Sequence, residues 1–515
     1  GKTALTINPD GTKKEVTTGL SKEYITQFSY GKAETFNLFV PRYMGGGTVE
    51  SLDKKSNTYQ YVSSIAGSKQ ADGFIKQVYT YWGDQLIVEA PAYVGAMMLF
   101  LFFLGVFILK GKYKYWLVAS SVFAILMSWG KNFQFLTDFF IDYVPLYNKF
   151  RAVSSFQVIA ELCIPLLGFL ALREFFCSKI DKKQKQIALK KALYSSMGLI
   201  VVGLLYALSF STFEGIRDAS YSEYEGLLDA VKADRLSMLY TDSFRSLVLI
   251  GLGFVVLWLF LRQQLKYTSS VIAFAVLILF DLVQVNLRYV NGDDFKEARA
   301  IDKPFKASTA DLQILKDKSH YRVANFSTDP FQDGRTSYFH KSIGGYHAAK
   351  MGRYQDLIEF QLSKQNMQVY NMLNVKYFII PRDNGEVMAQ QNPDANGNAW
   401  FVKNINYVQT ADQEIRALDS IQTKNTAIVN ENNIHRKINF SLEVDSLAYI
   451  KLTEYSLNSL TYETSSKFDE FSVFSEIYYK NGWKSYIDGE LQPYTNVNYV
   501  LRGMEIPKGE HIIKF

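Results

Sequence analysis

The chain has 515 residues, a formal net charge of +6 and two cysteines, Cys163 and Cys177. Two cysteines exclude a disulfide framework, so the polar regions must fold around hydrophobic cores of their own. Much of the positive charge lies in short connectors between apolar segments, where Lys and Arg orient a membrane protein and contact anionic lipid headgroups. We therefore expect membrane lipids as partners and no nucleic acid.

Residues 1–91 mix short strand-like runs with turn signals and end in an aromatic cluster just before the first apolar segment. We expect this segment to be extracytoplasmic. One interpretation of the cluster is an aromatic belt at the membrane interface. The other is an extracytoplasmic cleft in which Tyr81 and Trp82 stack on a sugar and Asp84 hydrogen-bonds to it.

Six apolar stretches follow, and each is close to the ~20 residues that cross a hydrocarbon core of about 30 Å. The sequence therefore predicts a polytopic α-helical membrane protein with a transmembrane domain at residues 92–288. The predicted spans are residues 92–109, 115–130, 154–172, 192–210, 245–261 and 268–288.

The connectors between these stretches alternate in charge. The first, third and fifth are rich in Lys and Arg, whereas the second and fourth are longer and mixed or acidic. The positive-inside rule places the three basic connectors in the cytoplasm. Because the number of predicted spans is even, both flanking segments are expected on the extracytoplasmic side.

The second connector, residues 131–153, has aromatic residues at helical spacing, which predicts an amphipathic helix lying in the membrane interface. Lys131, Lys149 and Arg151 lie within this connector. These cations are candidates for binding a lipid phosphate, and contacts with ordinary lipid headgroups are the alternative.

Ionisable residues also occur within the predicted spans. Glu161 lies in the third span, where a carboxylate is costly and marks a polar site or a partner. Pairing with Lys149 or Arg151, another structural ion pair, and a protonated acid bonded to a neighbouring helix are all open. Asp281 and Arg288 lie toward the outer end of the last span, where snorkelling toward water suffices to explain them.

From about residue 289 the pattern becomes that of a water-soluble module. Residues 289–382 contain helical and strand-like segments and predict an extracytoplasmic α+β subdomain. Residues 383–515 lose the helical periodicity and gain frequent turns, such as Asp488-Gly489. They predict an extracytoplasmic β-rich, sandwich-like subdomain.

Motifs for several common chemistries are absent from the sequence. The five histidines form no HExxH or other paired ligand spacing, and no P-loop or GxSxG elbow occurs. Because no recognisable motif encodes a metal site, the cofactor is unassigned, with a divalent metal left open.

Several motifs, in order along nearly the whole chain, resemble one bacterial family. They are Tyr81-Trp82-Gly83-Asp84-Gln85, Ser128-Trp129-Gly130-Lys131-Asn132, Tyr147-Asn148-Lys149-Phe150-Arg151, Gly344-Gly345-Tyr346-His347, Asn371-Met372-Leu373-Asn374-Val375-Lys376-Tyr377 and Tyr478-Tyr479-Lys480-Asn481-Gly482-Trp483-Lys484. Together they resemble the YfhO family of bacterial membrane proteins, which is similar to the glycosyltransferase C (GT-C) superfamily.

The resemblance implies an enzyme that transfers a sugar from a polyprenyl-phosphate carrier to a cell-envelope glycopolymer or glycolipid. The reaction would take place on the outer face of the bacterial cytoplasmic membrane. The superfamily usually carries its catalytic acidic residue in the first large outer loop, which we expect upstream of this chain, so no catalytic residue is assigned. The family usually ends in a further span, so we expect the chain to be an interior piece of a longer protein.

Two other functions are open. In a lipid-linked sugar flippase or exporter, Glu161 and the cations of the second connector would line a translocation path. In a non-catalytic envelope-binding scaffold, the outer module would bind its target and the spans would only anchor it.

Overall fold

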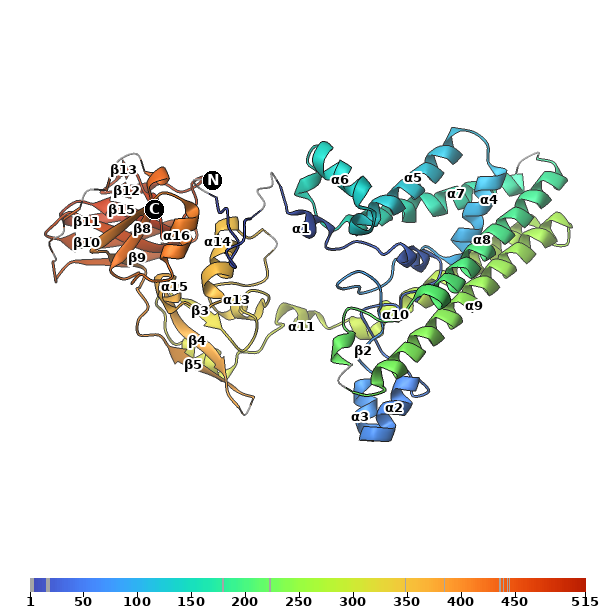
Figure 1. Cartoon of the computed structure of the whole chain (residues 1–515), viewed down its shortest axis with the longest axis horizontal. Coiled ribbons are helices and arrows are strands. Elements are labelled where there is room, and N and C mark those ends of the chain that lie inside the picture. The colour runs from blue at the N-terminus through green and yellow to red at the C-terminus, as the bar shows by residue number, and fades with distance from the viewer. Residues whose placement is uncertain are drawn as a thin grey trace. The chain divides into compact units, whose positions relative to one another are not determined.

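The computed structural model describes residues 4–14, 19–177, 180–221, 224–347, 349–383, 385–434, 437–438, 440–441, 443 and 445–515. The chain divides into two compact units (Figure 1). The helical unit is Thr17–Lys296, and the β-rich unit combines Gly1–Val16 with Glu297–Phe515. The first described residues therefore fold with the end of the chain: the Thr6 backbone N–H and hydroxyl both donate to the Asp412 carboxylate, at 2.8 and 2.5 Å.

The helical unit consists of long helices with short elements from the first part of the chain (Figure 1). Its elements are α1 Lys22–Thr26, η1 Ala33–Leu38, β1 Val49–Glu50, α2 Asn57–Ala66, α3 Ser68–Phe74, β2 Val78–Tyr79, α4 Ala96–Ile108, α5 Lys112–Ser128, η2 Gly130–Phe133, α6 Gln134–Tyr143, η3 Tyr147–Lys149, η4 Val153–Phe156, α7 Gln157–Cys177, α8 Lys182–Phe210, η5 Asp218–Ser220, α9 Leu227–Leu261, α10 Tyr267–Tyr289 and η6 Gly292–Asp294.

Four helical stretches among the described residues are long and apolar enough to cross a membrane: Val153–Cys177, Lys182–Phe210, Leu227–Leu261 and Tyr267–Asp294. Large apolar side chains are exposed on them, for example Leu162 on α7 and Leu279 on α10. Such exposed apolar faces are suited to contact with lipid rather than with water. These four helices confirm the prediction of a membrane protein, without its number of spans.

The first two predicted spans are shorter in the structure, so six spans are not confirmed. Helix α4 has 13 residues, and α5, which begins at Lys112, has 17. Helix α4 is apolar because it is buried on most of its surface, with Met97, Phe100 and Leu104 fully enclosed. It packs against α7, α8, α9 and α10. A helix that is hydrophobic all round is a helix surrounded by protein or lipid, and hydropathy alone does not separate the two cases.

Two glycines lie where α4 crosses α7. A Cβ added at Gly105 would lie 2.8 Å from Cγ of Leu167, and one added at Gly168 would lie 2.9 Å from Cβ of Leu101. Small residues let helices approach closely in a membrane bundle, where packing replaces the hydrophobic effect. The two glycines therefore set the spacing between α4 and α7.

Replacing Gly168 with alanine is expected to lower the free energy of unfolding by about 1–3 kcal/mol, because the two helices must move apart. Gly198→Ala on α8 is the matched control, since nothing lies within 4 Å of the added Cβ. The control should stabilise the protein by about 0.5–1 kcal/mol, because alanine favours a helix more than glycine does. Thermal unfolding in detergent measures both variants, and equal effects would contradict close packing at Gly168.

Helix α9 extends well beyond a bilayer core. Its 35 residues correspond to about 52 Å, against a hydrocarbon thickness of about 30 Å. Residues expected in an acidic connector form its first turns instead. Asp234 accepts hydrogen bonds from the backbone N–H groups of Asn57 and Thr58 at the start of α2, both at 2.8 Å. The polar part of α9 is thus a support for the segment that precedes the bundle.

The β-rich unit contains short helices and most of the strands. Its helices are α11 Ala298–Asp302, α12 Thr309–Ile314, α13 Arg335–Phe339, α14 Gly352–Leu357, the π-helix η7 Ile358–Leu362, α15 Met367–Met372, α16 Ala411–Ala417 and η8 Glu431–Asn433. Its strands are β3 Arg322–Asn325, β4 Val375–Pro381, β5 Val387–Gln391, β6 Ala399–Phe401, β7 Asn404–Val408, β8 Thr426–Asn430, β9 Tyr449–Ser456, β10 Ser459–Ser466, β11 Glu470–Ile477, β12 Ser485–Ile487, β13 Glu490–Gln492, β14 Thr495–Val497, β15 Leu501–Ile506 and β16 Gly509–Lys514.

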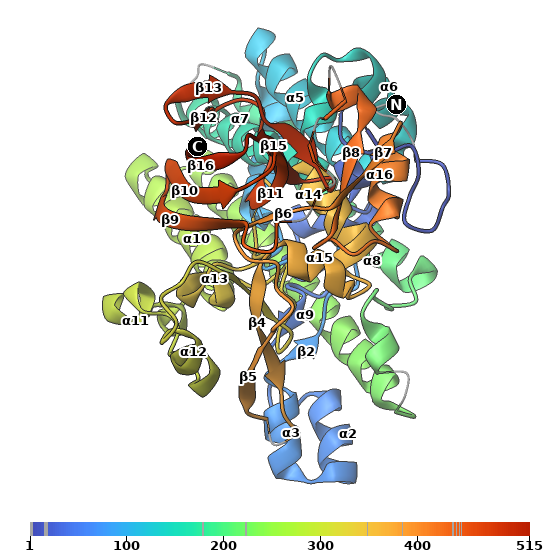
Figure 2. The ribbon, with the colours of Figure 1, turned by 90° about the vertical axis from the view of Figure 1, so that its left-hand side faces the viewer.

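Two antiparallel sheets of this unit pack face to face (Figure 2). Their strand orders are β13-β12-β16-β10-β9 and β14-β15-β11-β6. The layer between them is apolar: Tyr462 and Ile513 come from the first sheet, and Phe474 and Met504 come from the second. A separate sheet, β3-β4-β5, pairs β3 with β4 in parallel, and β7 and β8 form another parallel pair. The prediction of a β-rich C-terminal region is confirmed.

Candidate functional site

The helical unit contains a pocket of about 340 Å³. It is lined by Gly31, Lys32, Ala33, Met44, Trp82, Gly83, Asp84, Asn132, Tyr206 and Ser211. Five separate parts of the chain build it: the start of η1, Met44 between η1 and β1, the segment after β2, helix η2 and the end of α8. Because α8 is long and apolar enough to cross a membrane and ends at Phe210, the pocket lies at the end of a candidate span.

Glu34, next to the pocket on η1, is fully buried. Its Oε1 accepts hydrogen bonds from the Tyr81 hydroxyl at 2.6 Å and from Gln85 Nε2 at 2.9 Å, and Oε2 accepts one from the backbone N–H of Gly31 at 3.0 Å. Burial raises the pKa of Glu34, the hydrogen bonds oppose that shift, and the negative charge of Asp84 adds to it. A buried carboxyl group with a raised pKa beside a pocket is typical of a functional site.

Asp84 is the second carboxylate of the pocket, and unlike Glu34 it is exposed. Asn132 Nδ2 donates to its Oδ2 at 3.0 Å, and Lys131 Nζ donates to its backbone carbonyl at 3.4 Å. A Cβ at Gly31 would lie 2.9 Å from the same Oδ2, so a side chain there would displace the carboxylate. The pocket therefore has one exposed carboxylate within reach of a ligand, and a buried carboxyl group beside it that is bonded to protein groups.

The structure brings three of the sequence-derived candidates together. Trp82 and Asp84 line the pocket, and Lys131 contacts Asp84. Tyr81 does not line it: its ring is buried and its hydroxyl is bonded to Glu34, so it supports that carboxyl group. Trp82 is held between Phe213 and Tyr43, with ring centroids 4.9 and 6.4 Å away.

The other candidates lie elsewhere in the helical unit. Arg151 donates to the Tyr24 hydroxyl at 2.7 Å and lies over its ring, so its contacts are with α1. Lys149 is exposed at the end of η3, and Glu161 is exposed on α7. Within the residues that the structure describes, Glu161 forms no ion pair with either cation. Burial and the charge of Glu34 raise the pKa of Tyr30, with a smaller contribution from Glu161, which therefore lies near this tyrosine.

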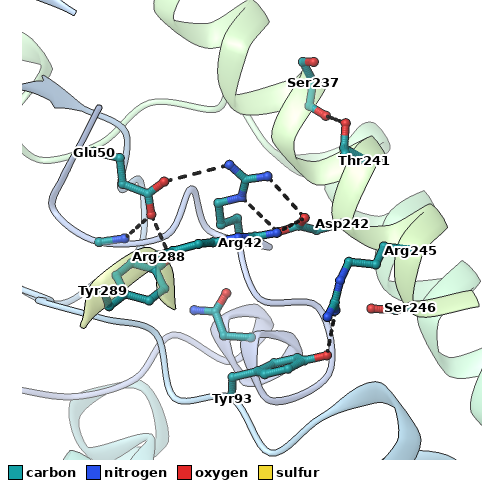
Figure 3. Close-up of polar contacts among 12 residues, drawn as sticks. Arg42, Glu50, Tyr93, Ser237, Thr241, Asp242, Arg245, Ser246, Arg288 and Tyr289 are labelled. Carbon is teal, nitrogen blue, oxygen red and sulfur yellow. Dashed lines mark hydrogen bonds and ion pairs between the residues drawn. The ribbon is translucent and has the colours of Figure 1, made fainter. Parts of the chain in front are cut away.

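An ion-pair network surrounds the fully buried Asp242 in the same unit (Figure 3). Two arginines each bind the Asp242 carboxylate through two nitrogens. Arg42 donates through Nε and Nη2 at 2.9 and 3.2 Å, and Arg288 donates through Nη1 and Nη2 at 2.8 and 3.1 Å. Glu50 lies 3.9 Å from Arg42 and accepts a hydrogen bond from the Tyr289 hydroxyl at 2.7 Å. Two arginines are thus balanced by two carboxyl groups.

A second pair lies on the same helices. Arg245 Nη1 donates to Asp281 Oδ1 at 2.9 Å, and the Tyr93 hydroxyl donates to the same oxygen at 2.6 Å. Asp281 is fully buried and also accepts from the backbone N–H of Met97 at the start of α4. The expectation that Asp281 and Arg288 snorkel toward water is therefore wrong, because each is paired with an opposite charge from α9.

The network is connected to the pocket through the turn that contains Arg42 and Met44. Arg42 is two residues before Met44, whose carbonyl accepts a hydrogen bond from the Trp82 backbone N–H at 3.0 Å. Ser246 on α9 donates to the Phe39 carbonyl at 2.9 Å. Sequence reasoning missed this arrangement, although Asp242 and Arg245, charged residues beside the long apolar run of α9, were a signal of it.

Among the described residues, no three His, Cys, Asp or Glu side chains gather closely enough to hold a metal ion. No protein-family model, curated protein or solved structure matches the chain. The chemistry of the pocket and its place at the end of a membrane helix are therefore the observations that bear on function.

Proposed function

We propose that the chain is part of a membrane glycosyltransferase of the GT-C type, similar to the YfhO family. It would transfer a sugar from a polyprenyl-phosphate carrier to a cell-envelope glycopolymer or glycolipid. The observation that carries the proposal is one pocket, beside the end of a candidate span, whose lining includes an exposed carboxylate and an indole and whose Asp84 is contacted by the Lys131 ammonium group. The motifs in residues 81–85 and 128–132, which resemble the family, supply the pocket residues Trp82, Asp84 and Asn132.

The position of the pocket suits a lipid-linked donor. The polyprenyl chain would stay in the bilayer while its phosphate lies at the membrane surface near Lys131. An ammonium group there stabilises the charge that develops on a departing phosphate. Trp82 and Met44 would contact the sugar, whose hydroxyls can bond to Asn132.

We assign proton transfer to Asp84, in place of the upstream acidic residue that the resemblance to the family implies. The acceptor hydroxyl oxygen would attack the anomeric carbon and form the new glycosidic bond, while the bond from that carbon to the phosphate oxygen breaks. The hydroxyl proton passes to the Asp84 carboxylate, and the lipid phosphate leaves with the bonding electron pair. Oδ1 of Asp84 suits this role, because among the described residues none donates a hydrogen bond to it. The buried Glu34 would hold the surrounding loop through Tyr81 and Gln85.

The proposal includes a topology. Helices α4 and α5 would cross the bacterial cytoplasmic membrane together with the four longer stretches, giving six spans. The basic connectors then face the cytoplasm. The end of α8, and with it the pocket, faces the outer side, as do the β-rich unit and the segment before the spans.

Transfer of label from a radiolabelled polyprenyl-phosphate sugar into polymer tests the function in membranes that contain the intact protein. We expect transfer by the unmodified protein and about 10–100-fold less by Lys131→Ala, since a charge-assisted contact to the phosphate is lost. Lys69→Ala, an exposed lysine on α3, should transfer normally.

Two results would contradict the proposal. Equal transfer by Lys131→Ala and Lys69→Ala at matched abundance would remove Lys131 from the donor site. Absence of transfer with several donor sugars, together with exposure of labelled lipid on the opposite leaflet, would favour an exporter instead.

A further inference from the structure

A second surface with aromatic rings and lysines lies at the end of the β-sandwich. Two depressions, of about 400 and 480 Å³, adjoin there and share Lys480, Trp483 and Lys484 in their lining. Tyr478 and Tyr494 line the first, and Lys514 and Phe515 line the second. We call this surface the Trp483 patch and define it by Tyr478, Lys480, Trp483, Lys484, Tyr494 and Lys514.

The loop between β11 and β12 builds the patch. It turns at Gly482, whose φ of 142° is a backbone conformation that side chains rarely adopt. The turn places Trp483 against the end of the sandwich core. The Tyr494 hydroxyl donates to the Tyr479 carbonyl at 3.1 Å, which ties the loop to the segment before β14.

The charge of the patch is of one sign. Lys480, Lys484 and Lys514 are exposed, and the two depressions have no Asp or Glu in their lining. Within the described part of the chain, none of the three lysines forms an ion pair. Lysines left unpaired around a concave surface attract an anionic ligand.

A buried arginine adds to this charge from beneath the rings. Arg502 on β15 is 2 % exposed, and its guanidinium carbon lies 4.4 Å from the Trp483 ring centroid and 5.2 Å from that of Phe515. Its Nε donates to the Ile477 carbonyl at 3.1 Å, whereas Nη1 has no hydrogen-bond partner among the described residues. The negative charge of Glu476 offsets part of the Arg502 charge, so the three exposed lysines remain the main source of positive charge at the patch.

The shape of the patch favours a sugar chain over a membrane surface. Trp483 and Tyr494 are only half-exposed and line hollows. Among the large apolar and aromatic side chains that line the first depression, Leu491 alone is exposed, whereas a surface that enters a bilayer presents several. Polar side chains, Asn458, Ser459 and Gln492, lie in the same lining and can bond to hydroxyl groups. The C–H face of a sugar ring packs on an aromatic face, whose negative quadrupole attracts the C–H hydrogens.

We propose that the Trp483 patch binds an anionic polysaccharide, with the sugar rings packed on Trp483 and Tyr494 and the acidic groups bound by the three lysines. The acidic groups can be carboxylates or phosphates. This binding does not depend on the transfer reaction, so it can be tested and can fail separately.

Binding to the full chain in detergent tests the patch with three fluorescent probes: oligogalacturonate, phosphorylated dextran and neutral dextran of similar length. We expect one or both acidic probes to bind more tightly than neutral dextran, and their ranking identifies carboxylate or phosphate as the preferred group. Trp483→Ala should weaken binding about tenfold, and a triple Lys480→Ala, Lys484→Ala, Lys514→Ala variant about 10–100-fold, with a steep dependence on salt.

Matched controls use residues outside the patch. A triple Lys364→Ala, Lys451→Ala, Lys467→Ala variant removes the same charge from exposed lysines of the same unit, and Tyr346→Ala removes an exposed ring. Both should bind as the unmodified protein does. Because Trp483→Ala also removes core contacts, the triple lysine variant, which leaves the core intact, decides the outcome if Trp483→Ala unfolds.

Three results would overturn the proposal. The first is absence of binding to both acidic probes. The second is an equal loss of binding in the patch and control lysine variants. The third is absence of probe binding together with binding to vesicles containing phosphatidylglycerol, if the patch lysine variant loses that vesicle binding. The last result would make the patch a membrane contact.

Discussion

Asp84→Asn is expected to lower sugar transfer by about 100- to 10,000-fold, the range that a general base contributes. The asparagine keeps an oxygen that can accept the hydrogen bond from Asn132, so the pocket should retain its shape. What is lost is the negative charge that takes the acceptor proton. The rate of label transfer at saturating donor, in membranes with matched protein abundance, measures the effect.

Two further variants test whether the effect is specific to the carboxylate of Asp84. Asp142→Asn changes an exposed carboxylate on α6, outside the pocket, and should leave transfer unchanged. Asp84→Glu keeps the carboxylate and should recover part of the activity. Full transfer by Asp84→Asn would show that the proton leaves by another route and would remove Asp84 from the chemistry.

Asp242→Ala is expected to lower the free energy of unfolding by about 3 kcal/mol, the lower end of the range for a buried pair, because it leaves the partly buried Arg42 and Arg288 without their counter-charge. Asp242 is fully buried and receives four hydrogen bonds from Arg42 and Arg288. Thermal or denaturant unfolding of the purified protein in detergent measures the loss. Asp142→Ala is the matched control and should change stability by less than about 0.5 kcal/mol.

The double variant Arg42→Ala, Asp242→Ala measures the interaction free energy between Arg42 and Asp242. In the double variant Arg42 is no longer present as a charge without a partner, so the loss in free energy of unfolding should be smaller than the sum of the losses in the two single variants. Additive losses would mean that Arg42 and Asp242 act independently. A stable Asp242→Ala protein with reduced transfer would instead assign the network to the pocket wall that includes Met44.

The membrane character of the chain could be predicted from sequence because hydropathy is a local property. A run of apolar residues such as residues 268–288 has no stable place in water, whatever the rest of the chain does. For residues 92–109 the same reasoning does not separate a membrane span from a helix enclosed by protein, since the 13 residues of α4 are buried on most of their surface within the bundle. Local composition is the same in both cases, and only packing distinguishes them.

The candidate site was predictable only in part. Trp82, Asp84 and Lys131 were candidates because aromatic, acidic and basic residues beside a membrane interface suggest sugar and phosphate chemistry. Glu34 gave no such signal, since it lies in a short segment without a motif. Its importance comes from Tyr81 and Gln85, which meet it only when the loop after β2 folds onto η1.

The sequence by itself determined the apolar helices, the β-rich end of the chain and the residue types at the pocket. Only the tertiary structure decided which charges meet: Arg42 reaches Asp242 across 200 residues, and Arg245 reaches Asp281 across 36. The physical reason is that burial of an apolar side chain needs no particular partner, whereas a buried charge needs one specific partner at hydrogen-bond distance. That partner depends on how helices cross and rotate against one another, which no local pattern encodes.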